Sequence, residues 1–210
     1  MIRKTFESKS EVDTYLSEQK IRMEKGYLTV SERTELKSLL EKPESLIVPK
    51  QKDITEYKKI ITNINALKVP CLEVRKDEDI KHIIKDLKDT LNCVSGLGLS
   101  APQIGYNRQI SYIKIPKITK DKKIEFNEYI LINAKIIEKD RPIQVKNEGC
   151  LSFPGVSVDT LRYVFCTVEY LNEKMELQTG MMQDLESLAV QHEIDHQNSI
   201  TIFDRKWKAK

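Results

Sequence analysis

The segment His192-Glu193-Ile194-Asp195-His196, near the C-terminus, is the most informative part of the sequence. Residues four apart in an α-helix lie about 40° apart around its axis, so the imidazoles of His192 and His196 can reach one metal ion. Glu193 lies roughly 100° from His192 around the same axis and can carry protons beside the ion without binding it. This H-E-x-x-H pattern predicts metal-assisted hydrolysis, for which a tetrahedral site needs a third protein ligand.

We expect the motif to lie on a helix over residues 182–197. The apolar stripe of this helix consists of Leu185, Leu188 and Ala189. His192 and His196 continue the stripe, so both rings are expected to face the interior, where a neutral imidazole needs a polar partner. Two core histidines with ordinary hydrogen bonds are the alternative, but the glutamate beside the first histidine favours a metal site.

The third ligand has few candidates. Only 14 residues follow His196, and they contain no histidine or glutamate and a single acid, Asp204. Among the four cysteines, Cys150 differs from the others because it follows Gly149 between two expected strands, where a glycine lets the backbone come close to a site. A thiolate and two imidazoles would leave one position of a tetrahedron open for chemistry.

The composition narrows the class of protein. The 35 basic and 32 acidic side chains nearly balance, so we do not expect nucleic acid or an anionic membrane as the main partner. No apolar run approaches the ~18–20 residues that a membrane-spanning helix needs, and residues 1–20 lack the apolar core of a signal peptide. The four cysteines are too few and too scattered for a disulfide framework, so we expect a cytoplasmic protein.

Residues 66–210 are expected to form a compact α+β domain, preceded by a helical extension over residues 1–65. The last helix of the extension is expected to begin near Asp53 and to reach Ile64, and a helix of the domain to follow Asp77. Strands are predicted over residues 109–115, 128–137, 143–146, 162–171 and 175–178. Because these strands do not alternate regularly with helices, the pattern argues against a doubly wound parallel sheet. We expect antiparallel or mixed sheets around a central metal-binding helix.

Three segments resemble the signatures of the peptide deformylase family. Residues 96–105 read Gly-Leu-Gly-Leu-Ser-Ala-Pro-Gln-Ile-Gly, residues 148–152 read Glu-Gly-Cys-Leu-Ser, and residues 191–196 read Gln-His-Glu-Ile-Asp-His. Any one of them could arise by chance, but all three occur in the order of the family, and the resemblance covers roughly residues 67–205.

The resemblance implies a metal site and a reaction. Cys150 would join His192 and His196 as ligands of one divalent metal ion, with ferrous iron as the native metal and zinc, nickel or cobalt as substitutes in purified protein. The reaction would be hydrolysis of the N-formyl group on the formyl-methionine of newly made polypeptides. Glu193 would take the proton of the attacking water and pass it to the leaving amine.

The resemblance also implies how the substrate is held. The side-chain amide of Gln103 and the backbone N–H of Leu151 would stabilise the oxyanion. Gly98, which lacks a Cβ, would let its backbone pair with an extended peptide, while an apolar pocket holds the methionine. We also consider that Glu148, together with Arg162, orients a ligand histidine, with a plain surface carboxylate as the alternative.

Several positions depart from the pattern of the family. Ser100 stands where alanine is usual, Gln197 where leucine is usual and Ser199 where glycine is usual. The segment after Ser152 lacks an arginine that many members carry, which leaves the substrate contacts beyond methionine open.

Two other functions are compatible with parts of the sequence. A metallopeptidase using the same helix predicts a third ligand other than cysteine, so the metal content of Cys150→Ala would distinguish it. A non-catalytic relative acting as an interaction module is disfavoured by the presence of Glu193 and Gln103. The extension over residues 1–65 could pack on the domain, contact the ribosome or mediate self-association, and the sequence does not choose among these.

Overall fold

The computed structural model of the protein describes residues 16, 57–119, 121 and 123–208. Apart from Leu16, these residues belong to one compact unit, Glu56–Lys210. The helical extension predicted over residues 1–65 therefore lies almost entirely outside the described residues. None of the described helices combines the length and the apolar character that crossing a membrane requires.

One five-stranded antiparallel sheet forms the frame of the unit, with its strands in chain order. The strands are β1 (Gly98–Ser100), β2 (Ile110–Ile118), β3 (Ile124–Gly149), β4 (Ser157–Leu171) and β5 (Leu177–Gln183). The helices are α3 (Ile64–Leu67), α4 (Lys81–Cys93) and α5 (Asp184–Gln197), with short 3-10 turns η2 (Ala101–Ile104) and η3 (Ile202–Arg205). The expected α+β class with an antiparallel sheet is confirmed.

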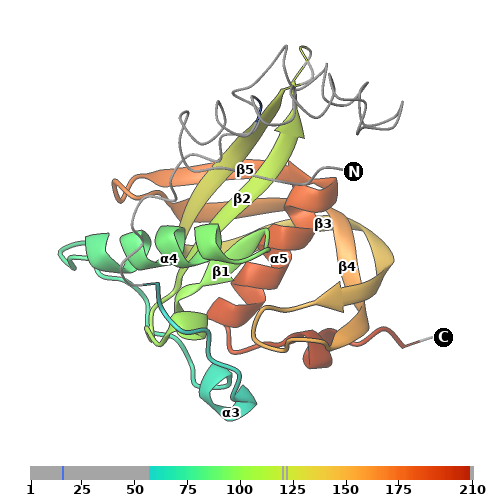
Figure 1. Ribbon diagram of the computed structural model, residues 1–210, viewed down its shortest axis with the longest axis horizontal. Helices are drawn as coiled ribbons and strands as arrows, with labels where there is room; N and C mark the ends of the chain where they lie inside the picture. The colour runs from blue at the N-terminus through green and yellow to red at the C-terminus, as the bar shows by residue number, and fades with distance from the viewer. Residues whose placement is uncertain (1–15, 17–56, 120, 122, 209–210) are drawn as a thin grey trace. The chain divides into compact units, whose positions relative to one another are not determined.

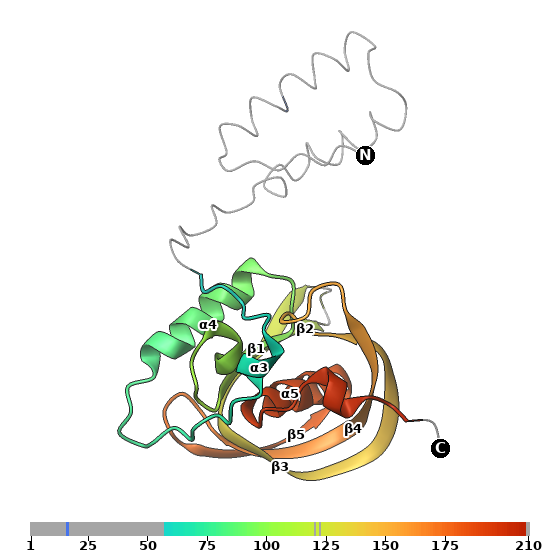
Figure 2. The same cartoon turned by 90° about the horizontal axis from the view of Figure 1, so that it is seen from below.

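Two layers of core lie on opposite faces of the sheet. Along β2, Ile110 and Tyr112 belong to the cluster that includes Leu87 of α4, whereas Ile113 belongs to the cluster that includes Val190 of α5. Successive side chains of a strand point to opposite faces, so a strand covered on both sides is apolar without alternation. Figure 2 shows the strands β3 and β4 curving around α5, while α4 covers the other side of β1 and β2.

The long strand β3 corrects the sequence prediction. Residues 128–137 and 143–146, expected as two strands, belong to one strand that shifts its register against β4 at three places. Two of these shifts contain residues with positive φ, Asn133 at 51° and Asn147 at 55°. Asparagine tolerates this conformation well, and a bulge bends the strand without ending it. The bends let one strand curve around α5 (Figure 1) and end at residue 149, beside the helix.

The helix expected from Asp53 to Ile64 is also wrong over its described part. Residues 57–63 are not helical, and helix begins only at α3. The N–H of Ile61 donates to the main-chain oxygen of Gln103 at 2.8 Å, and Ile60 packs on the core beneath α4. These tertiary contacts accompany a non-helical backbone, although the apolar residues of the segment recur with a helical period.

Candidate metal centre and active site

The structure brings together the three residues predicted to bind a metal. Cys150 directly follows β3, and His192 and His196 lie one turn apart on α5. One ligand atom from each lies within 4.8 Å of the other two, and Cys150 Sγ is 3.3 Å from His196 Nε2. Among the described residues this is the one such group of three or more His, Cys, Asp or Glu side chains. A thiolate and two imidazoles in this arrangement fit a divalent transition metal.

The alternative third ligand lies elsewhere. Asp204, on η3, accepts hydrogen bonds from Lys68 and from the backbone and hydroxyl of Thr201. Its pKa is lowered to about 2, because the bonds from Lys68 and Thr201 outweigh the opposing effect of burial. Asp204 is thus held by its own partners and does not belong to the metal-binding group.

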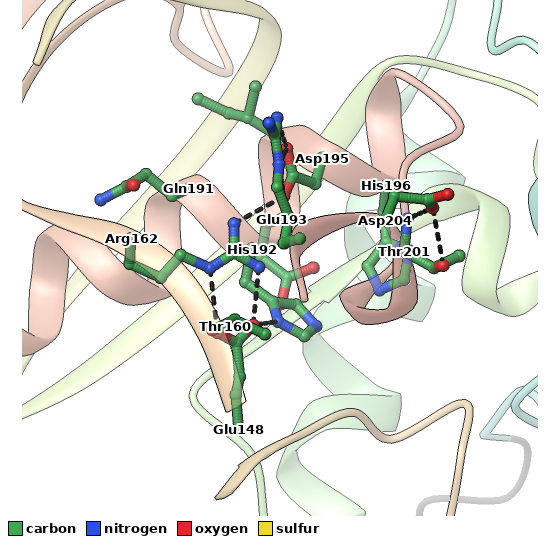
Figure 3. A network of polar contacts seen from close by, with 12 residues as sticks. Glu148, Thr160, Arg162, Gln191, His192, Glu193, Asp195, His196, Thr201 and Asp204 are labelled. Atoms are coloured by element: carbon green, nitrogen blue, oxygen red, sulfur yellow. Dashed lines mark hydrogen bonds and ion pairs between the residues drawn. The ribbon is translucent and has the colours of Figure 1, made fainter. Parts of the chain in front are cut away.

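His192 is oriented by a carboxylate. Its Nδ1 lies 2.6 Å from Glu148 Oε1, which leaves Nε2 to face the site. Arg162, only 2% exposed, holds the same carboxylate through Nε at 2.9 Å and Nη2 at 2.6 Å, and Thr160 donates its hydroxyl to it as well (Figure 3). Glu148 is therefore not a surface carboxylate, because it is clamped between the histidine and a buried arginine.

The network of ion pairs continues from Arg162 to Asp195. Arg162 Nη1 donates to Asp195 Oδ2 at 2.5 Å, and Arg205 Nη2 donates to the other oxygen of Asp195 at 2.6 Å. Neither Asp195 nor Arg205 was predicted from the sequence to take part in the site. The only available signal was the position of Asp195 inside the helix motif, one residue before His196.

Charge in this network sets the protonation of the histidines. Burial by itself would lower the pKa of His192, but its hydrogen bonds with Cys150 and Glu148 raise it to about 10. Burial would likewise raise the pKa of Glu148, and hydrogen bonds with His192 and Arg162 hold it well below its usual value. Burial, together with the nearby His192, holds the pKa of His196 well below its usual value. A proton on His192 therefore competes with a metal ion for the same ring.

Glu193 occupies a confined place beside β1. It is 4% exposed, and burial raises its pKa against the opposing effect of His192. A Cβ on Gly98 would lie 2.6 Å from Glu193 Oε1 and 2.7 Å from its Cγ. Glycine at position 98 is thus required for the carboxylate to lie where it does, a role that the sequence analysis did not foresee.

The expected oxyanion donors lie near the cysteine. Gln103, in η2 and 1% exposed, accepts the N–H of Ser100 at its Oε1, at 2.8 Å. This bond orients the amide so that Nε2 faces Ser152 Oγ at 3.2 Å and Cys150 Sγ at 3.7 Å. Leu151 follows Cys150 at the start of a turn, so its backbone lies next to the same thiol.

A cavity of about 620 Å³ opens over these groups. Its polar end is lined by Gly98, Gln103, Cys150, Leu151, His192 and Glu193, and its apolar walls include Leu97, Val145, Phe153, Leu185 and Leu188. Two residues of the expected apolar stripe, Leu185 and Leu188, line this cavity instead of the core, and Leu185 is 45% exposed. The third, Ala189, is buried in the core as expected, together with Val190 and Ile194. An apolar cavity that ends at polar groups is typical of a ligand site.

The chain is similar in sequence and fold to known peptide deformylases. A family model described as Polypeptide deformylase matches residues 52–210. Peptide deformylase 2 of Clostridium perfringens is 38% identical over 140 residues, which cover 67% of this chain and 86% of the relative. Peptide deformylase 1 of Nostoc sp. is 36% identical over 142 residues, covering 67% and 73% respectively. The crystal structure of peptide deformylase from Ehrlichia chaffeensis matches with a TM-score of 0.65 and 30% identity, over 73% of this chain and 89% of that one.

Proposed function

This chain belongs to the polypeptide deformylase family, and from this premise we propose how its residues remove the formyl group from newly made polypeptides. The reaction is hydrolysis: a formyl-methionyl peptide and water give formate and a peptide with a free methionine amine. The assignment of roles rests on one observation: two members of the Cys-His-His group, Cys150 and His192, line the same cavity as Glu193 and Gln103.

Cys150, His192 and His196 would hold one divalent metal ion. His192 would use Nε2, since Glu148 takes its Nδ1. When bound, the metal lowers the pKa of a water molecule so that it can act as a nucleophile near neutral pH. The donor set suits iron(II), zinc, nickel and cobalt. We propose ferrous iron as the native metal, on the basis of the family resemblance.

Glu193 would move the proton. Its carboxylate follows a ligand histidine directly in the sequence and lines the cavity without belonging to the metal-binding group. A carboxyl group with a raised pKa can take a proton from the water and return it to the leaving amine in one catalytic cycle.

Gln103 and Leu151 would stabilise the oxyanion that forms on the formyl oxygen. The amide of Gln103 is held by Ser100 and Ser152, and the N–H that faces Cys150 would turn from the thiol to the oxyanion. The backbone N–H of Leu151 would be the second donor.

The peptide would lie along β1. This short strand is at the edge of the sheet and contains Gly98, so an extended substrate could add to it by main-chain hydrogen bonds. The apolar wall of the cavity, with Leu185 and Leu188, would receive the methionine side chain.

The rest of the chain and its location are proposed from the sequence. From the sequence we assign residues 66–210 to the catalytic domain and residues 1–65 to a helical extension, in a cytoplasmic protein, except that residues 57–63 are not helical and belong to the same compact unit as the domain. A contact between the extension and the ribosome stays a prediction, which cosedimentation of the full chain with purified ribosomes would test.

The decisive experiment is anaerobic reconstitution with ferrous iron, followed by an assay of formate release from formyl-Met peptides. Wild type should be active, whereas Glu193→Ala should keep its metal and lose activity by about 10²–10⁴-fold. Equal rates for the two proteins would contradict the mechanism. Cys150→Ala should lose the metal, and full metal retention would favour a metallopeptidase-like site with another ligand.

A further inference from the structure

A chain of buried polar side chains ends on the carboxylate of Glu193. Gln197 Nε2 lies 2.8 Å from Ser111 Oγ, which lies 2.7 Å from Ser100 Oγ, which lies 2.6 Å from Glu193 Oε2. Ser100, Ser111 and Gln197 are 0% exposed, and Glu193 is 4% exposed. Since water does not reach these groups, they must satisfy one another.

The backbone of β3 sets the direction of the hydrogen bonds. Gln197 Nε2 donates to the main-chain oxygen of Leu131 at 3.1 Å, and Gln197 Oε1 accepts the N–H of Ala134 at 3.3 Å. These contacts orient the amide, so its second N–H donates to Ser111. A hydroxyl has one proton, and Ser111 then donates its own to Ser100.

The proton of Ser100 goes to Glu193. Both hydroxyls also lie near the main-chain oxygen of Glu193, at 3.0 Å for Ser100 and 3.4 Å for Ser111. The two shorter contacts, from Ser111 to Ser100 and from Ser100 to Glu193 Oε2, use both hydroxyl protons. Oε2 of the carboxylate is thus occupied, and Oε1 is the oxygen on the side of Gly98.

Ser100 contacts two groups of the proposed site at once. Its hydroxyl donates to Glu193 Oε2, and its backbone N–H donates to Gln103 Oε1 at 2.8 Å. One residue at the end of β1 therefore holds both the proton carrier and the amide donor. The backbone bond needs no particular side chain, whereas the bond to Glu193 exists only because position 100 carries a hydroxyl.

We propose that Ser100 is a positioning residue whose hydroxyl, directed by Ser111 and Gln197, fixes Glu193 Oε2 and leaves Oε1 to carry the proton. This inference rests on the proposed function. Ser100 and Gln197 are two of the positions at which the sequence departs from the family pattern described above.

The test compares wild type with Ser100→Ala as full-length, iron-loaded proteins. We expect kcat to fall about tenfold, as for loss of a hydrogen bond to a charged group, while KM for a formyl-Met peptide and metal content stay unchanged. Ser187→Ala is the matched control, because Ser187 is also buried, lies on α5 and donates to Tyr163 O at 3.0 Å, away from Glu193. Its kcat should equal that of wild type.

A double mutant separates positioning of Glu193 from a general packing effect. Added to Glu193→Gln, Ser100→Ala should lower kcat no further, because its effect acts through the carboxylate. A full tenfold loss in that background would overturn the inference, as would an unchanged kcat in Ser100→Ala alone while wild type is active.

A crystal structure of Ser100→Ala gives a readout independent of activity. We expect the Glu193 carboxylate to leave its single position, and an unchanged position would overturn the inference. An iron-loaded wild type without deformylase activity would contradict the proposed function instead, and the structure would still decide whether Ser100 orients Glu193. If Ser100→Ala does not fold, Ser100→Cys, which keeps the shape with a weak donor, serves for the same measurements and should show the same changes in smaller degree.

Discussion

Glu148 Oε1 lies 2.6 Å from His192 Nδ1, and this contact sets which ring nitrogen faces the metal site. The carboxylate cannot turn away, because buried Arg162 holds both of its oxygens. A carboxylate that fixes a ligand histidine raises the basicity of the ring and its affinity for metal. The proposed site thus depends on a residue two positions before Cys150 as well as on the three ligands.

Glu148→Gln should weaken metal binding, because glutamine keeps the shape of the side chain but loses its charge. We expect the metal affinity to fall about 10–100-fold, measured by competition with a chromophoric chelator. The control is Glu78→Gln, which removes the charge of another glutamate paired with an arginine, Arg108, outside the site. The idea fails if both variants bind metal as tightly as wild type.

Arg162→Ala should destabilise the fold. The substitution removes the cation that Glu148 and Asp195 share. Their side chains are only 12% and 6% exposed, so both carboxylates lose a partner away from water. We expect a loss of about 3–5 kcal/mol in the free energy of unfolding of the metal-free protein, measured with urea. Lys135→Ala removes an exposed pair with Glu73 and should cost at most about 1 kcal/mol. Equal losses for the two variants would contradict a stabilising role of the buried ion pairs of Arg162.

Gly98→Ala separates two roles of this glycine. If the new Cβ displaces Glu193, kcat should fall by about 10²-fold with metal content unchanged. If Gly98 serves only the backbone of the substrate, KM should rise and kcat should stay near wild type. We expect the first result. Gly180→Ala is the control, because a Cβ there meets only the flexible end of Met182, at 3.3 Å.

Metal binding near pH 7 should release a proton from His192. In the metal-free protein the pKa of His192 is about 10, so the ring is protonated at neutral pH, whereas a metal ligand must be neutral. Apparent affinity should therefore rise with pH up to about 10. Conversely, the stability that charged His192 adds to the metal-free protein is complete below its unfolded pKa of about 6.5 and is lost as pH rises through about 10.

Calorimetry in buffers of different ionisation enthalpy measures this release. The observed enthalpy should depend on the buffer, and the number of protons released should be smaller in Glu148→Gln, which lacks one of the groups that raise the pKa of His192. An equal number in wild type and Glu148→Gln would count against His192 as the source.

Much of the site was predictable because two of its three proposed ligands lie close together in the sequence. Two histidines four residues apart on one helix share a face wherever that helix packs, and the resemblance to a known signature added Cys150. The prediction that Leu185 and Leu188 face the core was wrong for a physical reason. A helical period shows that one face is apolar, but it does not show whether core or a cavity covers that face.

The sequence by itself determined the α+β class, the family and the donor types at the proposed metal site. Only the tertiary structure decided that β3 is one bent strand, that residues 57–63 are not helical and that Gly98 makes room for Glu193. It also decided that the hydroxyl of Ser100 meets a carboxylate 93 residues away in the chain. Such contacts depend on the packing of α5 against β1 and β2. Short-range periodicity does not encode this packing, because many segments with the same apolar pattern could bury the same face.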